Sequence, residues 1–181
     1  MDYRQKQVLL KNGQSAVFRA PNGKDGQAML DYLKEICAET DFLASFPEEI
    51  HFTADDESKY LQDILDSPNR LMIVCTVDGE LAGNCQIVFM TSMKTKHRAA
   101  VMIGLRKKFW NLGIGSAMFS ELIEIAKAKG TAQLELEVFE HNRRAMALYR
   151  KMGFEVMATH PDAFRLRDGS SQAAVFMRKV L

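Results

Sequence analysis

The most constraining feature of the chain is a glycine turn between an apolar run and a helical pattern, in residues 105–119 (LRKKFWNLGIGSAMF). The apolar run over residues 99–105 predicts a strand, and apolar residues spaced by three or four predict a following helix that ends at Gly130. Glycine lets the backbone approach a ligand closely, and the first turn of a helix has N–H groups without internal partners. The helix dipole also favours an anion there. The segment therefore predicts a phosphate-binding turn at Gly113 and Gly115.

Two common phosphate-binding motifs fit this turn poorly. A P-loop requires a Gly-Lys-Ser/Thr sequence, and no lysine stands at that place. A dinucleotide-binding turn requires a small residue where Met118 stands. Its first glycine also follows the strand directly, whereas here seven residues, Arg106 to Leu112, separate the apolar run from Gly113. Glu135 and Glu137 do lie at about the separation expected of a ribose-binding acid. An NAD-dependent oxidoreductase therefore stays an alternative.

A second motif lies in residues 134–154 (LELEVFEHNRRAMALYRKMGF), where an alternating strand precedes a short helix. Asn142 is a suitable N-cap for this helix, and Gly153 is a suitable C-terminal stop. The glycine turn followed by the string Asn-x-x-Ala-x-x-Leu-Tyr-x-x-x-Gly-Phe resembles the GCN5-related N-acetyltransferases (GNAT family), over residues 71–181. The resemblance implies an enzyme that transfers the acetyl group of acetyl-CoA to a primary amine, directly within a ternary complex.

The resemblance also implies a cofactor role for residues of both motifs. The backbone of the glycine turn is expected to hold the pyrophosphate, and the strand before the turn to pair with the pantetheine arm. The second helix is expected to lie beside that arm. The residues that the resemblance assigns to cofactor binding are Ile103, Gly104, Leu105, Leu112, Gly113, Ile114, Gly115, Ser116, Asn142 and Tyr149. Trp110 stands where the family signature has Gln or Arg, so backbone contacts are expected to suffice there.

Acetyl transfer requires an acid for the leaving thiolate and an amine that is neutral when it attacks. Tyr149 lies two helical turns after Asn142 on the same face, and it matches the general acid proposed for the family. Ala100 stands where many relatives carry a Glu that takes the amine's proton. The remaining candidates for the base are His97, Glu137, Glu140 and His141. A water chain is the alternative to a single base, and a non-catalytic acyl-CoA-binding module is the alternative function.

The remaining segments predict an α/β fold with a mixed sheet in one domain over residues 1–181. Expected features are hairpins at Asn12-Gly13, Asp78-Gly79 and Asp168-Gly169, helices over residues 25–39 and about 53–66, and a turn at Pro161-Asp162. The resemblance adds that this sheet is splayed and flanked by helices, with the cofactor between two parallel strands.

The composition favours a cytoplasmic protein without nucleic-acid or membrane partners. Lys and Arg number 24 against 23 Asp and Glu, so no basic excess indicates nucleic-acid binding. No apolar run of 18 residues and no secretion signal are present. Cys37, Cys75 and Cys85 are expected to be buried free thiols, and no spacing typical of metal ligands occurs. A homodimer is one option for the assembly.

The acceptor amine is left open by the sequence. Residues 35–57 contain eight acidic side chains and no Lys or Arg, and in the family's fold this region covers the acceptor site. Such a wall would attract an ammonium group, but acidic residues also simply solvate helices and favour helix starts. A polyamine, an aminoglycoside, an amino acid and a protein N-terminus all remain candidates.

Overall fold

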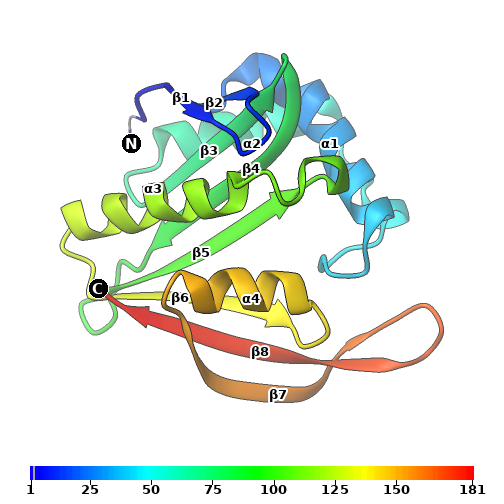
Figure 1. Cartoon of the computed structure of the whole chain (residues 1–181), viewed down its shortest axis with the longest axis vertical. Coiled ribbons are helices and arrows are strands. Elements are labelled where there is room, and N and C mark those ends of the chain that lie inside the picture. The colour runs from blue at the N-terminus through cyan, green and yellow to red at the C-terminus, as the bar shows by residue number, and fades with distance from the viewer. Residues whose placement is uncertain (2) are drawn as a thin grey trace.

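A single eight-stranded sheet forms the centre of the protein in a computed structural model that describes Met1 and residues 3–181 (Figure 1). Its strand order is β1-β2-β3-β4-β5-β6-β8-β7. The strands are β1 (Lys6–Leu9), β2 (Ser15–Arg19), β3 (Arg70–Val77), β4 (Glu80–Phe89), β5 (Arg98–Leu105), β6 (Gln133–Phe139), β7 (Glu155–Arg165) and β8 (Ser171–Val180). Among the strands of the described residues, β5 and β6 alone pair in parallel, and the other neighbours are antiparallel. The predicted mixed sheet is confirmed.

Helices cover both faces of this sheet (Figure 1). One face carries α1 (Gly26–Glu39) and α2 (Ala54–Asp66), and the other carries α3 (Ile114–Ala128) and α4 (Arg143–Lys151). The side chain of Thr53 accepts a hydrogen bond from the Asp56 N–H and caps α2, as Asn142 caps α4. Among the residues that the structure describes, no helix is long and apolar enough to cross a membrane.

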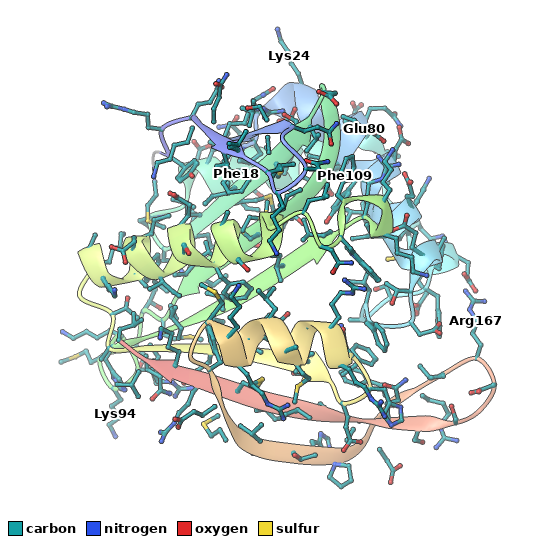
Figure 2. The ribbon with its side chains drawn as sticks, in the orientation of Figure 1. Phe18, Lys24, Glu80, Lys94, Phe109 and Arg167 are labelled. Atoms are coloured by element: carbon teal, nitrogen blue, oxygen red, sulfur yellow. The ribbon has the colours of Figure 1, made fainter. Side chains whose placement is uncertain are left out.

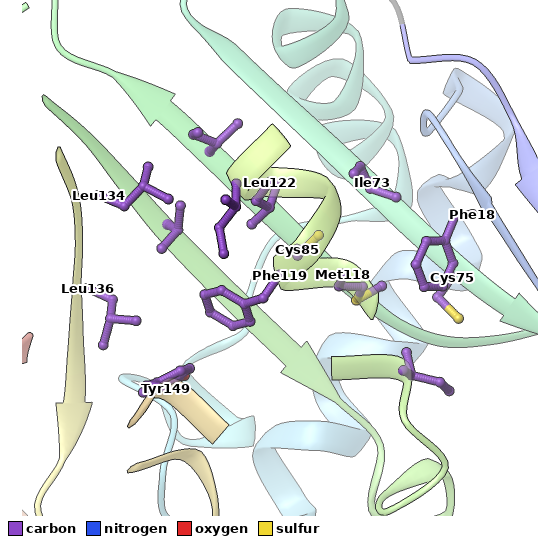
Figure 3. Close-up of a cluster of buried hydrophobic side chains, with 14 of the residues drawn as sticks. Phe18, Ile73, Cys75, Cys85, Met118, Phe119, Leu122, Leu134, Leu136 and Tyr149 are labelled. Atoms are coloured by element: carbon purple, nitrogen blue, oxygen red, sulfur yellow. The ribbon is translucent and has the colours of Figure 1, made fainter. Parts of the chain in front are cut away.

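Alternation along the central strands divides the core between the two helical layers. On β3, Met72 and Val74 pack with α1 and α2, whereas Ile73 and Cys75 pack with α3. Figure 3 shows the cluster of buried side chains between the sheet and α3, in which Phe119 of α3 projects toward Tyr149 of α4. The three cysteines are free, and Cys37 is half-buried rather than buried as expected, because it lies beside the α1 stripe that packs on the sheet.

The expected hairpins and helices are present, but the expected turn at Pro161-Asp162 was wrong. The strand β7 continues through these residues with a bulge, since His160 pairs with Ala174 and Phe164 with Gln172. Asp162 takes a positive φ of 51° within the bulge. Proline lacks an N–H group, and it is tolerated here because β7 is an edge strand.

We expect Phe119→Ala to destabilise the fold by about 3–5 kcal/mol, because the ring is fully buried and meets Tyr149 and Phe154 edge-on at 5.2 and 5.7 Å between centroids. Urea unfolding followed by circular dichroism measures this loss. Met93→Ala is the control, since Met93 is 86% exposed and its change is expected to stay within about 0.5 kcal/mol. A loss below about 1 kcal/mol for Phe119→Ala would contradict this description of the core.

Candidate active site

A cavity of about 600 Å³ opens between the end of β5, the glycine turn, α4 and the segment after α1. Its lining residues come from five places along the chain. They are Lys11 before β2; Ile36, Thr40, Phe42 and Leu43 at and after α1; Ile103, Gly104 and Leu105 of β5; Trp110, Asn111, Gly113, Gly115 and Ser116 of the turn; and Asn142, Arg143, Arg144, Ala145, Ala147, Leu148 and Tyr149 of α4. The two predicted motifs therefore meet at one site.

The cavity exists because β5 and β6 separate after a short pairing. They pair only where Arg98 to Ala100 face Gln133 to Glu135, and beyond that point they diverge (Figure 1). The guanidinium of Arg98 donates two hydrogen bonds to the Glu135 carboxylate, at 2.5 and 2.6 Å, and lowers the pKa of Glu135. This ion pair joins β5 to β6 at the end of the opening where the two strands still pair.

The divergence leaves part of the β5 backbone without a strand partner. Hydrogen bonds from the Met90 N–H to the Arg98 carbonyl and from the Arg106 N–H to the Ala82 carbonyl fix the alternation of the β4–β5 ladder. By this alternation Gly104 turns its backbone groups toward β4, and Ile103 and Leu105 turn theirs toward the opening. Gly104 was expected to share the pairing with pantetheine, and in this register its backbone groups face β4.

Packing against Tyr32 of α1 requires that position 104 carry no side chain. A Cβ there would lie 2.5 Å from the hydroxyl oxygen of Tyr32, which donates a hydrogen bond to Asn84 at 2.9 Å. The glycine therefore lets α1 pack closely over the cavity end of β5.

The glycine turn presents free backbone donors to the cavity. Gly113 begins α3 in the left-handed region, with φ of 93°. The N–H groups of residues 112–116 donate no hydrogen bond to another described residue, and no side chain caps this helix. A Cβ at Gly115 would lie 3.0 Å from Cδ2 of Leu148, so the glycine also lets α4 pack closely against the start of α3. These free donors at a helix start are suited to an anion.

Trp110 contributes to the site in a way that the sequence did not indicate. Its indole N–H donates to the Leu105 carbonyl at 2.8 Å, which occupies one of the two acceptor positions of this oxygen. The guanidinium of Arg144 lies 4.5 Å from the centre of the indole ring and also donates to Asn111. The residue that departs from the family signature thus fixes a cation at the cavity.

Tyr149 reaches the cavity from a largely apolar environment. Tyr149 is 7% exposed, and its ring packs edge-on against Phe119. The hydroxyl forms no hydrogen bond with another described residue. Burial raises the pKa of Tyr149 to about 12, so the phenol stays protonated at any physiological pH. Asn142 lines the same cavity, but its side-chain oxygen accepts from the Ala145 N–H at 3.1 Å and caps α4.

The other predicted residues lie outside the cavity lining. His97 is exposed at the start of β5, about 20 Å of strand from Ile103. Glu137 is exposed on the β6 face opposite Leu136 and Val138. Of the turn residues, Ile114 is buried in the core and Leu112 accepts a hydrogen bond from Lys11. Glu140 and His141 are exposed ahead of α4.

Most acidic residues between positions 35 and 57 serve the fold. Five of the eight pair with a cation or accept from a backbone N–H: Glu35, Glu39, Glu48, Glu49 and Asp56. Asp41 lines a smaller cavity of about 170 Å³ beside Leu43. Burial raises the pKa of Glu57. The acidic composition therefore reflects mainly helix capping and ion pairing.

Sequence reasoning missed the residues that come from outside the two motifs. Thr40, Phe42 and Leu43 follow α1 in a loop without a recognisable pattern. Lys11 precedes the first hairpin turn, about a hundred residues before the glycine turn. Only the fold brings these segments to the cavity.

Comparison with known proteins identifies the family. Residues 33–154 match the model of the acetyltransferase (GNAT) family. The chain belongs to the GNAT acetyltransferases. This assignment confirms the N-acetyltransferase predicted from the two motifs, with acetyl-CoA as the acetyl donor, and it decides against the oxidoreductase alternative.

Several acetyltransferases are similar to this chain. An L-amino acid N-acetyltransferase of Escherichia coli is 30% identical over 118 residues, which are 65% of this chain and 72% of that protein. A streptothricin acetyltransferase of Streptomyces lavendulae is 26% identical over 90% of this chain and 81% of its own length. The crystal structure of a GNAT acetyltransferase from Streptococcus pneumoniae superposes with a TM-score of 0.85 at 26% identity, covering 92% of this chain and 99% of that one.

We expect Gly115→Glu to abolish binding of acetyl-CoA to this GNAT protein, because its side chain would project toward Leu148, Leu105 and Ile103 and add a negative charge beside the free N–H donors, where it repels phosphate. Isothermal titration calorimetry measures the binding. Gly115→Gln, of nearly equal size and without charge, separates repulsion from the crowding against Leu148. Binding retained by a folded Gly115→Glu protein would contradict the placement of the phosphates.

Proposed function

We propose that this enzyme binds acetyl-CoA in the 600 Å³ cavity, with the phosphates at the glycine turn and the pantetheine arm along the free edge of β5. The observation that carries the proposal is the divergence of β5 and β6 next to a helix start with free N–H donors. An extended arm can pair with Ile103 and the N–H of Leu105, as an added strand does. The thioester then lies toward Tyr149.

Tyr149 is the proposed general acid for the departing thiolate. The amine attacks the thioester carbonyl, the carbon–sulfur bond breaks, and the phenol gives its proton to sulfur. A phenol whose pKa is about 12 is a weaker acid than an ordinary thiol, whose pKa is about 8.5. Burial raises the pKa of a thiol in the same cavity as well, which narrows this difference.

Glu137 is the proposed base among the acidic candidates. It lies on the β6 face that also carries Phe139, and the ring of Phe139 lies 6.2 Å from that of Phe42, a cavity residue. A water molecule would carry the amine's proton to it. His97 lies at the far end of β5, so its proposed role as a base has less support from the geometry.

The acceptor amine is proposed to enter past Leu43, which lines both cavities. Aromatic rings and one carboxylate surround this entrance. The smaller cavity is lined by Asp41, Leu43, Ala44, Ser45, Phe46, Phe139, Ala163, Phe164, Arg165 and Leu166. Arg167 extends from the β7–β8 hairpin to the loop after α1, where it pairs with Glu48 and lies 4.4 Å from the ring centre of Phe46 (Figure 2). These contacts favour a small amine with an apolar group, and a relative named as an L-amino acid N-acetyltransferase agrees with a small acceptor.

The proposal also includes the number of domains, the cellular compartment and the partners. The sheet that runs from Lys6 to Val180 supports one domain over residues 1–181. Free cysteines, with Cys75 and Cys85 buried and the pKa of each thiol raised by burial, are typical of a reducing compartment such as the cytoplasm. A homodimer and the absence of a nucleic-acid partner stay predictions from the sequence.

Thermal melting tests the cofactor directly. Acetyl-CoA at about one hundred times its Kd is expected to add about 2.7 kcal/mol and to raise Tm by about 5–10 °C, because it binds the folded state alone. NAD at the same concentration is the control and is expected to give no shift. No shift with acetyl-CoA in folded protein would contradict the proposal.

We expect Tyr149→Phe to lower kcat by about 100-fold while the Kd for acetyl-CoA changes less than about threefold, because only the proton donor is removed. Release of free thiol with an amine acceptor measures kcat, and calorimetry measures Kd. Tyr60→Phe is the matched control, since Tyr60 is half-exposed on α2 outside the cavity lining. Equal rates for Tyr149→Phe and the native enzyme would remove Tyr149 from the reaction.

A further inference from the structure

The N-terminal hairpin contacts the glycine turn through its own turn residues. The backbone N–H of Lys11 donates to the Leu112 carbonyl at 3.1 Å, so the β1–β2 turn is fixed against the residue before Gly113. Within the hairpin turn, the Gly13 N–H donates to the Leu10 carbonyl at 3.0 Å. The position of Lys11 is therefore set by backbone contacts and does not depend on its side chain.

The side chain of Lys11 lies along the glycine turn and lines the cavity. Its carbons Cγ, Cε and Cδ would lie 3.6 to 3.9 Å from a Cβ built at Gly113. The ammonium group pairs with no carboxylate among the described residues. A lysine that packs its carbons on the turn and keeps its charge unpaired is positioned to meet an anion.

The charges of the surrounding lining agree with this role. The charged side chains that line the cavity are Lys11, Arg143 and Arg144, and within the described part of the chain no acidic side chain joins them. Coenzyme A carries a pyrophosphate and a 3′-phosphate. The free N–H groups of the turn suit the pyrophosphate, and the cations lie on both sides of these donors, from the hairpin and from α4.

We propose that Lys11 binds a phosphate of the cofactor, so that the N-terminal hairpin is part of the acetyl-CoA site. This inference rests on the proposed function, because it takes the 600 Å³ cavity as the cofactor site. Lys11 lies outside residues 33–154, which match the family model, so the family match by itself does not assign this contact. The hairpin and α4 then hold the phosphates from opposite sides of the glycine turn.

The test compares Lys11→Gln with the native enzyme by calorimetry, using acetyl-CoA, 3′-dephospho-acetyl-CoA and acetyl-pantetheine. We expect the Kd for acetyl-CoA to rise about tenfold or more, since a charge-assisted contact is lost, and the Kd for acetyl-pantetheine to stay unchanged. A loss with both nucleotide ligands places Lys11 at the pyrophosphate, and a loss with acetyl-CoA alone places it at the 3′-phosphate. Lys11→Arg is expected to keep most of the affinity.

The control is Lys24→Gln, because Lys24 is exposed and points away from the protein (Figure 2). It removes the same charge and is expected to leave all three affinities unchanged. Equal affinity of Lys11→Gln and the native enzyme for acetyl-CoA would overturn the inference, as would equal weakening toward all three ligands. Failure of the native enzyme to bind acetyl-CoA would instead overturn the proposed function.

Discussion

The early end of the parallel pairing between β5 and β6 is the constraint on which the site depends. Three residues of each strand pair, with the Arg98–Glu135 ion pair beside them, and then the strands diverge. A buried backbone group without a partner is costly, so an unpaired inner edge persists only where a ligand or water can satisfy it. The opening therefore exposes backbone groups that the proposed function assigns to an extended ligand, and the helices pack on both faces of the sheet.

The site also depends on close approaches that only glycine permits. Gly104 lets Tyr32 reach Asn84 over β5, and Gly115 lets Leu148 of α4 pack against the start of α3. Larger residues at these positions would push α1 or α4 away and widen the cavity. The same two residues were singled out in the sequence for contact with the cofactor, and packing is an equally strong reason for their presence.

The sequence predicted what local chemistry determines and missed what the fold brings together. The glycine turn and the Asn142 cap were predicted because each signal lies within a few neighbouring residues. The Pro161-Asp162 turn was wrong because proline disrupts a strand only where its N–H would have been paired, and the edge position of β7 is not visible locally. The indole of Trp110 and the approach of Lys11 depend on contacts across the chain. Periodicity cannot show such contacts.

Cations of the cavity lining lie beside the glycine turn, and under the proposed function this charge sets the direction in which the cofactor lies. Lys11 packs along Gly113 and Arg144 donates to Asn111 of the turn, whereas Phe42 and Leu43 line the cavity from the loop after α1. A ligand with phosphates at one end and a neutral thioester at the other gains electrostatic energy in only one orientation. The buried phenol of Tyr149 stays neutral beside the apolar part of this lining. Under the proposed function, the fold separates the charges that hold the cofactor from the buried phenol that protonates the leaving sulfur.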